Sequence, residues 1–233
     1  MLMRDGNRER LKAAARALGP VREEVVFVGG AVAGLLITDE GAASPRPTFD
    51  VDVVAKVGTY LEYSNLGERL ESLGLRPDPS PGAPMCRWTA GEALIDVMPL
   101  DEGILGFSNR WYELAMQSAW QTELEPGLPI RVIEPVCFLA TKLEAFLGRG
   151  EGRLVDSHDL EDLLAVVDGR ETIVAELDGV AAELRSFLHR EIGCLLERRG
   201  FADAAAGFLL PDAASQARLE TVLDRLRGLA GRE

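Results

Sequence analysis

The sequence has few residues that could build a disulfide framework or a structural zinc site. It contains only three cysteines, Cys86, Cys137 and Cys194, and two histidines, His158 and His189. The cysteines are widely separated, and none forms the C-x-x-C pair that is typical of zinc and redox sites. This composition excludes a disulfide-rich secreted scaffold and argues against a structural zinc centre.

Long apolar runs are also missing. No stretch approaches the roughly 18 consecutive apolar residues of a transmembrane helix, and residues 1–10 carry charges where a secretory signal would be apolar. With 233 residues, of which 47% are hydrophobic and 27% charged, the chain can instead bury the core of one large domain or two small ones. We therefore expect a soluble, cytoplasmic protein with no membrane partner.

Positive charge is scarce, and lysine is its scarcest form. The chain has 38 acidic against 25 basic residues, a formal net charge of -13, and lysine only at Lys12, Lys56 and Lys142. Such a charge repels polyanions at long range unless arginines cluster locally, so we expect no DNA partner, whereas small cations are attracted. The rarity of lysine makes Lys142 notable, because it lies in an apolar helical segment.

The hydrophobic pattern changes near residue 135. Strands are predicted at 24–30, 49–57, 85–89, 93–98 and 130–133, and helices at 7–18, 31–38, 60–73, 135–147, 157–167, 170–199 with one break, and 212–229. Residues 101–111 and 115–122 show no clear pattern. We predict an α/β domain over residues 1–134, followed by a helical domain over residues 135–233.

Two aspartates, Asp50 and Asp52, interrupt an apolar strand. Alternation places both on one face, where burying two like charges without a cation would be costly. Asp96 interrupts a second apolar strand and could reach the same ions. Carboxylate oxygens suit Mg²⁺, and three acids on adjacent strands could form a two-metal site for phosphoryl or nucleotidyl transfer. The alternative is that the D-x-D pair simply meets water at a strand end.

Two further segments are candidates for phosphate contact. Gly29 and Gly30 end a buried strand before a helix, so backbone N–H groups there could approach a phosphate closely. Tight packing at a strand-to-helix turn would equally explain the pair. Arg149 and Arg153 flank a glycine-rich turn and could also meet phosphate, although we favour solvated loop positions for both.

These motifs resemble the DNA polymerase β-like nucleotidyltransferase superfamily, and specifically its AbiEii/AbiGii toxin branch. The residues that carry the resemblance are Gly29-Gly30, the R-x-T-x-D-x-D string from Arg46 to Asp52, Asp96, the lysine helix 142–149, and the helix from Ser157 to Leu163, whose Asp159 and Asp162 resemble the aspartates of a K-D-x-x-D-L motif. The resemblance covers roughly residues 25–167. It implies an α/β fold with a nucleotidyltransferase-type mixed β-sheet and flanking helices, followed by a helical carboxy-terminal half. Two departures are Gly-Gly in place of the usual Gly-Ser and a long interval between Gly30 and Asp50.

The resemblance also implies roles for the acids and glycines. Asp50 and Asp52 would ligate both of two Mg²⁺ ions. Asp96 would ligate one of them and act as the base toward the acceptor hydroxyl. Gly29 and Gly30 would hold the triphosphate of a nucleoside triphosphate substrate.

Four other residues receive roles in the same way. Lys142 would contact the nucleotide phosphates or offset charge in the transition state, and Asp159 would orient Lys142 or the acceptor. Arg46 and Thr48 would touch phosphate or brace the metal-binding loop. The alternatives are a Lys142 side chain that reaches water from the edge of its helix, and an Asp159 that is only a helix-start acid after an N-cap at Ser157.

The activity that the resemblance implies is Mg²⁺-dependent transfer of a nucleoside monophosphate to an acceptor hydroxyl, with release of pyrophosphate. The branch implies the toxin-like half of a toxin–antitoxin or phage-defence pair, with a cognate antitoxin as partner and tRNA or a protein side chain as acceptor. Two alternatives stay open. The negative charge favours a small cationic acceptor such as an aminoglycoside. A non-catalytic binding module with the same fold is less consistent with three clustered acids.

Overall fold

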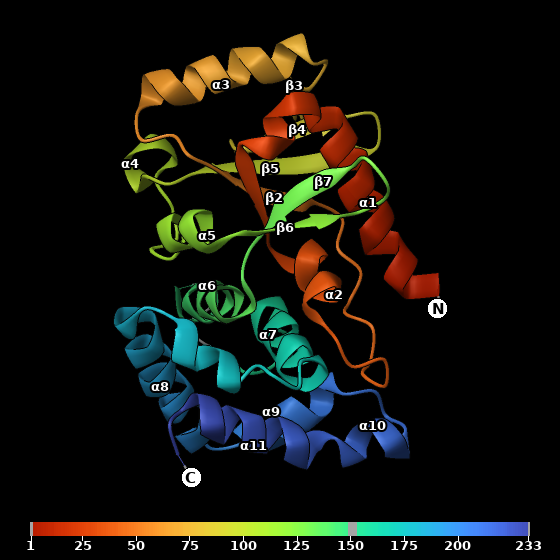
Figure 1. Cartoon of the computed structure of the whole chain (residues 1–233), viewed down its shortest axis with the longest axis vertical. Helices are drawn as coiled ribbons and strands as arrows, with labels where there is room; N and C mark the ends of the chain where they lie inside the picture. The colour runs from red at the N-terminus through yellow and green to blue at the C-terminus, as the bar shows by residue number, and fades with distance from the viewer. Residues whose placement is uncertain (1, 149–152, 233) are drawn as a thin grey trace. The chain divides into compact units, whose positions relative to one another are not determined.

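The computed structural model describes residues 2–148 and 153–232, and the chain divides into two compact units (Figure 1). Unit 1 consists of Met1–Val32 and Pro47–Glu134, and unit 2 consists of Ala33–Arg46 and Pro135–Glu233. The segment 33–46, which the sequence placed with the amino-terminal half, bonds to the helices of unit 2. Thr38 and Asp39 both donate backbone hydrogen bonds of 2.9 Å to the carbonyl oxygen of Gly169.

Unit 1 is built on a seven-stranded mixed sheet, which confirms the predicted α/β fold. The strands are β1 (Val25–Val28), β2 (Val51–Ala55), β3 (Arg76–Pro77), β4 (Arg87–Ala90), β5 (Ala93–Pro99), β6 (Trp120–Glu123) and β7 (Pro129–Val132), in the order β3-β4-β5-β2-β1-β7-β6. β2 is parallel to β5 and β1 to β7, and the other neighbours are antiparallel. The sequence did not predict β6, because its residues are mostly exposed and show no apolar alternation.

The helices of unit 1 cover its sheet. They are α1 (Leu2–Leu18), the 3-10 helices η1 (Gly19–Glu23) and η2 (Gly30–Val32), α3 (Tyr60–Ser72), α4 (Glu102–Leu105) and α5 (Tyr112–Ser118). α1 buries Leu11 and Leu18, two residues of the face predicted from the sequence. α3 starts at a capping box, in which the Thr59 side chain accepts a hydrogen bond from the Glu62 backbone N–H and the Glu62 carboxylate accepts one from the Thr59 backbone N–H.

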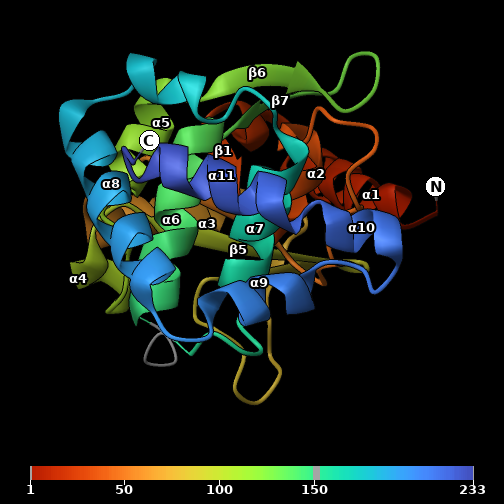
Figure 2. The same cartoon turned by 90° about the horizontal axis from the view of Figure 1, so that it is seen from below.

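Unit 2 is helical (Figure 2). Its elements are α2 (Ala33–Leu36), α6 (Pro135–Gly148), α7 (His158–Gly169), the 3-10 helix η4 (Ala175–Gly179), α8 (Ala182–Glu197), α9 (Phe201–Phe208), α10 (Ala213–Ala217) and α11 (Leu219–Leu229). α6 and α11 both pack against α7 and α8. The predicted helix at 170–199 is only partly correct, because Arg170 and Val180 are extended and separate η4 and α8 from α7.

α6 is apolar on most of its surface. Ten of its 14 residues are buried, including Phe138 and Phe146. A membrane-spanning helix needs about 20 residues, and no helix within the described ranges is long and apolar enough to cross a bilayer. The apolar sequence of α6 is therefore used inside the helical unit.

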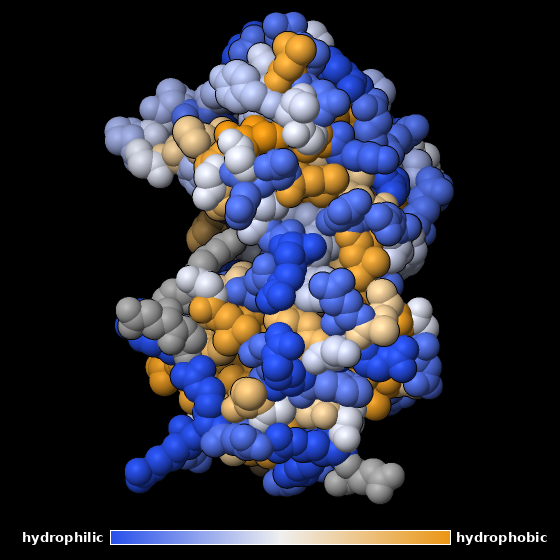
Figure 3. Space-filling view, turned by 90° about the vertical axis from the view of Figure 1, so that its left-hand side faces the viewer, coloured by the Kyte–Doolittle hydropathy of each residue, from blue (hydrophilic) through white to orange (hydrophobic). Residues whose placement is uncertain are grey.

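The surface mixes hydrophilic and apolar side chains. Figure 3 shows hydrophilic residues separating the apolar ones over the face in view. Among the large exposed apolar side chains, Phe49 is 80% exposed and immediately precedes Asp50, and Met85 is 72% exposed and lies two residues before Arg87. Two apolar side chains therefore flank charged residues of the candidate site along the chain.

Candidate functional site

Acidic residues from neighbouring strands of unit 1 lie side by side across the sheet. Antiparallel pairing aligns Val28 of β1 with Asp52 of β2, and parallel pairing aligns Asp52 with Asp96 of β5. Aligned residues of neighbouring strands lie about 4.8 Å apart, and their side chains leave the same face of the sheet. From the sequence, Asp96 was expected to be able to reach the same ions as Asp50 and Asp52. The strand register makes Asp52 and Asp96 neighbours.

Asp50 lies just before β2 and is positioned by Thr48. The Thr48 hydroxyl donates to the carbonyl oxygen of Asp50 at 3.2 Å, and the Thr48 backbone N–H donates to Oδ1 of Asn7 in α1 at 2.9 Å. Thr48 is only 4% exposed. Of the two roles predicted for Thr48, these contacts support bracing of the loop before Asp50. The acids Asp50, Asp52 and Asp96 are called the carboxylate row below.

Arg87 of β4 joins two members of the carboxylate row. Pairing of β4 with β5 aligns Arg87 with Asp96. The guanidinium donates to both oxygens of Asp96 at 2.8 Å, and its Nη2 also donates to Oδ2 of Asp50 at 2.5 Å. The hydrogen bonds to Asp96 raise the pKa of Arg87 above its usual value. Arg87 therefore holds Asp50 and Asp96 together as a shared counter-ion.

The sequence interpretation missed Arg87, although a signal for it was present. The turn between the two predicted strands contains Gly91 and Glu92, and a two-residue hairpin loop there aligns residue 90 with residue 93. Counting outward from that pair aligns Arg87 with Asp96, which is the observed register. The pairing of Arg87 with Asp96 therefore follows from strand register and not from their spacing along the chain.

The absence of a side chain at Gly29 leaves space for the Asp52 carboxylate. Its backbone has a φ of +69°, and a Cβ atom added there would lie 1.8 Å from Oδ2 of Asp52. A side chain at this position would overlap the Asp52 carboxylate and strain the backbone. Gly30 is buried in η2. Packing against Asp52 therefore explains why a glycine occupies position 29. The contact of Gly29 and Gly30 with a triphosphate stays a prediction.

A buried cysteine lies next to Arg87 in the chain. Cys86, the residue before Arg87, is 2% exposed. Burial raises the pKa of its thiol to about 12, with a further contribution from the Asp96 charge. The thiol is therefore protonated at neutral pH.

The donor set fits a hard divalent cation in its chemistry and its backbone placement. The three members of the row are carboxylates, Asp52 and Asp96 are register neighbours, and Gly29 leaves space at Asp52. In their present positions, however, no three acidic, histidine or cysteine side chains among the described residues converge closely enough to hold a metal ion. Asp50 and Asp96 converge on Arg87 instead, so cation binding requires these contacts to rearrange.

A second charged cluster lies within unit 2 and is centred on Asp162 of α7. Lys142 of α6 contacts Oδ2 of Asp162 at 2.7 Å and Oδ1 of Asp159 at 3.1 Å. Arg46 donates to both oxygens of Asp162, at 2.9 and 3.2 Å. The Asp162 side chain is 1% exposed. Arg46, Lys142, Asp159 and Asp162 are called the Asp162 cluster below.

The structure places the predicted members of this cluster as follows. Lys142 meets carboxylates rather than extending into water, and Asp159 contacts it, as the predicted orienting role requires. Ser157 is the N-cap of α7, where its hydroxyl accepts from the Leu160 backbone at 3.2 Å. Arg46 bonds to Asp162, so the R-x-T-x-D-x-D string contributes to two different clusters.

Two other candidates for phosphate contact were Arg149 and Arg153. Arg149 lies outside the described residues, and Arg153 is exposed. The central role of Asp162 was not predicted. Its signal was the position of an acid between two leucines on the buried side of α7, Leu160 and Leu163.

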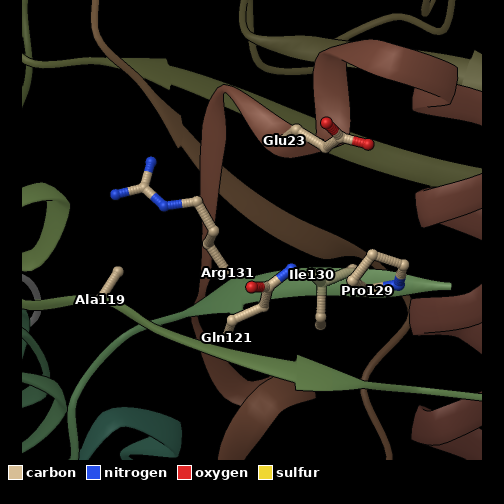
Figure 4. A pocket seen from close by; sticks show the side chains of 6 residues that line it. All are labelled: Glu23, Ala119, Gln121, Pro129, Ile130 and Arg131. Carbon is tan, nitrogen blue, oxygen red and sulfur yellow. The ribbon is translucent and has the colours of Figure 1, made fainter.

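Unit 1 also has a pocket at the opposite edge of the sheet from β3 and β4. It has a volume of about 390 Å³ and is lined by Glu23, Ala119, Gln121, Pro129, Ile130 and Arg131. Figure 4 shows Gln121 and Arg131 projecting from the paired strands β6 and β7. In the sheet order, β1 lies between these strands and β2. The pocket therefore contains none of the residues predicted for the site.

Comparison with known proteins gives similarity at the level of fold. No family model matches the chain, and no curated protein matches it in sequence. An antigenic nucleotidyltransferase-like protein from Paracoccidioides brasiliensis superposes with a TM-score of 0.51 and 20% identity, over 91% of this chain and 96% of that one. A candidate nucleotidyltransferase from H. pylori has a TM-score of 0.49 and 13% identity, over 97% of this chain and 92% of that one. JHP933 from Helicobacter pylori has a TM-score of 0.48 and 14% identity, over 98% and 90%. At 20% identity the likeness to the Paracoccidioides brasiliensis protein shows the fold alone, and the chain has a nucleotidyltransferase-like fold.

Proposed function

We propose that this protein is a Mg²⁺-dependent nucleotidyltransferase. It would transfer a nucleoside monophosphate from a nucleoside triphosphate to an acceptor hydroxyl and release pyrophosphate. The observation that carries the proposal is the register of Asp52 and Asp96 on adjacent parallel strands, with Asp50 linked to Asp96 through Arg87. Carboxylates grouped in this way suit two-metal phosphoryl transfer, and the nucleotidyltransferase-like fold supports the same reaction.

The carboxylate row would do most of the chemical work. Asp50 and Asp52 would hold both ions and Asp96 one of them, and divalent cations there would neutralise charge on the phosphates and activate the acceptor oxygen. Asp96 would also accept the proton of the acceptor hydroxyl. Gly29 would keep space for the Asp52 carboxylate beside the triphosphate.

Lys142 and Asp159 keep their predicted roles in this proposal. Lys142 would contact the nucleotide phosphates, and Asp159 would orient it. The support is their 3.1 Å contact, and Asp162 also holds Lys142. We expect Lys142→Met to weaken nucleotide binding more than Asp159→Asn does, because Asp162 still positions the lysine in the second variant.

Labelled nucleotides test the reaction directly. Each of the four α-³²P-labelled nucleoside triphosphates is incubated with the protein and Mg²⁺, together with total tRNA, an aminoglycoside panel or no acceptor. We expect label in one acceptor class, lost with EDTA and lost in Asp96→Asn, whose fold is checked by circular dichroism. No labelled acceptor, together with no Mg²⁺-dependent triphosphate binding by calorimetry, would contradict the proposal and favour a non-catalytic binding module.

The acceptor class separates two versions of the function. A tRNA acceptor accords with a toxin-like role, in which a neighbouring gene would encode an antitoxin. We then expect growth arrest on expression of the wild type, none with Asp96→Asn, and relief by the neighbouring product. A small cationic acceptor, such as an aminoglycoside, is favoured by the net charge of -13. Label in aminoglycosides without growth arrest would identify this second version.

A further inference from the structure

We propose that Arg87 is a built-in competitor for the metal site. Its guanidinium holds Asp50 and Asp96 in the metal-free protein and must leave them before a divalent cation can bind. The inference rests on the proposed function, because it takes the carboxylate row to bind such a cation.

Arg87 contacts the same carboxylate oxygens that a divalent cation would use. Nε and Nη2 donate to the two oxygens of Asp96 at 2.8 Å, and Nη2 donates to Asp50 at 2.5 Å. A Mg²⁺ ion needs carboxylate oxygens at about 2.1 Å with near-octahedral geometry. An ion that bridges Asp50 and Asp96 and the Nη2 group that bridges them now would occupy overlapping positions. Arg87 and the cation therefore bind the same acids in alternative states.

The backbone limits how Arg87 can leave. Register pairing of β4 with β5 fixes its main chain beside Asp96, so the side chain alone must swing away. The Arg87 side chain is 20% exposed and that of Asp50 is 35% exposed, which leaves a path toward solvent. Release of Arg87 is thus a side-chain rotation at the surface and requires no change in the sheet.

The positive charge of Arg87 should weaken the binding of a divalent cation to the carboxylate row by a measurable factor. Replacing Arg87 by a neutral residue removes one positive charge a few ångströms from the site, which should tighten binding of a divalent cation at least about tenfold. The same change removes the counter-ion of Asp50 and Asp96, so the metal-free protein should be less stable. A residue with only a structural role would lower stability without tightening metal binding.

The experiment is calorimetric titration of the full chain with MnCl₂ and no nucleotide. We expect Arg87→Gln to bind Mn²⁺ at least about tenfold more tightly than the wild type. Arg87→Lys keeps the charge but loses the bidentate fork, so it should tighten binding by a smaller factor. The matched control is Arg69→Gln, which removes another bidentate arginine of unit 1, bonded to Glu24, and should leave Mn²⁺ affinity unchanged.

Thermal unfolding supplies a second readout. Without metal, Arg87→Gln should melt below the wild type, and saturating Mn²⁺ should narrow that gap, because the cation replaces the lost counter-ion. Arg69→Gln should show the same small deficit with and without Mn²⁺. A gap in Arg87→Gln that Mn²⁺ leaves unchanged argues for a purely structural arginine and overturns the inference.

The titration separates the inference from the proposed function. Equal or weaker Mn²⁺ binding by Arg87→Gln, with clear binding by the wild type, overturns the competition and leaves the metal site in place. Absence of binding in both proteins, or binding unaffected by Asp50→Asn with Asp52→Asn, overturns both. If Arg87→Gln does not fold, Arg87→Lys decides, because unchanged or weaker affinity in that variant overturns the competition.

Discussion

The carboxylate row of unit 1 and the Asp162 cluster of unit 2 balance their charges in opposite ways. In the row, one arginine, Arg87, bridges two acids, Asp50 and Asp96. In the Asp162 cluster, one fully buried carboxylate receives hydrogen bonds or ion pairs from two cations, Arg46 and Lys142. In the first cluster one cation is shared by two acids, and in the second one buried acid is shared by two cations.

This difference in charge pairing indicates that the two clusters have different functions. Neighbouring carboxylates repel one another unless cations approach them, so the row is suited to binding cations. A buried carboxylate with several strong donors is held in place, and removing it would take from Arg46 and Lys142 the acceptor that they share. We therefore expect substitutions in the row to change chemistry and substitutions at Asp162 to change stability.

The double variant Asp50→Asn with Asp52→Asn is the strongest test of whether the carboxylate row serves chemistry rather than stability. We expect nucleotide transfer to be abolished, because the metal-binding oxygens are lost, while the free energy of unfolding changes by no more than about 1 kcal/mol. Repulsion within the row falls, and Arg87 keeps its bidentate contact with Asp96. Transfer assays and urea unfolding without metal measure the two effects. Retained transfer would refute the assigned role of the row.

Asp162→Ala should produce the largest loss of stability. Arg46 and Lys142 would lose their shared buried acceptor, which should cost about 3–5 kcal/mol. Urea unfolding measures this, with Asp159→Ala as the matched control in the same helix, since Asp159 contacts Lys142 alone among these cations. If both variants lose equal stability, Asp162 is not the centre of the cluster.

Gly29→Ala should produce an intermediate effect in unit 1. The positive φ strains any other residue by about 1–3 kcal/mol, and the new Cβ would displace the Asp52 carboxylate. Gly91→Ala is the matched control, because Gly91 also has a positive φ, of +59°, but no atom within 4 Å of an added Cβ. Urea unfolding should show a loss in both variants, and only Gly29→Ala should also lose Mn²⁺ binding. Equal Mn²⁺ affinity in the two would separate Gly29 from the row.

The smallest effect concerns the pH dependence of a peripheral ion pair in unit 2. A hydrogen bond from Arg218 to Asp39, supported by one from the Gly41 backbone, lowers the pKa of Asp39 below its usual value. This stabilisation is complete above the unfolded pKa of about 3.9 and is lost as pH falls through the lower folded pKa. Unfolding of wild type and Asp39→Asn at pH 6 and pH 3 should show a difference that shrinks at pH 3. A constant difference would rule out ionisation of Asp39 as its source.

Much of the candidate site was predictable because strand alternation is a local property. The faces of Asp50 and Asp52 follow from a period of two, and the N-cap at Ser157 follows from residue type. Strand β6 was not predictable, since an exposed edge strand with polar residues has no hydrophobic signal. The position of the break between η4 and α8 was not predicted, although Gly179 and Val180 lie there.

Arg46 illustrates what local patterns cannot supply. It lies two residues before Thr48 in the sequence, yet it bonds to Asp162, 116 positions further along the chain. Such a partner is chosen by how segments pack, and a buried carboxylate can recruit a guanidinium from any part of the chain that reaches it.

By itself the sequence determined the kind of chemistry: acids set into apolar strands, a glycine where a strand ends, and a rare lysine in an apolar helix. Periodicity fixes the face on which each residue lies, and residue type fixes which ligands it prefers. Tertiary structure alone decided which charges meet. Pairing of β4 with β5 brought Arg87 to Asp96, and packing of α6 and α7 brought Lys142 to Asp162. Charged groups stabilise one another only within a few ångströms, and such distances depend on packing between segments that are remote in sequence.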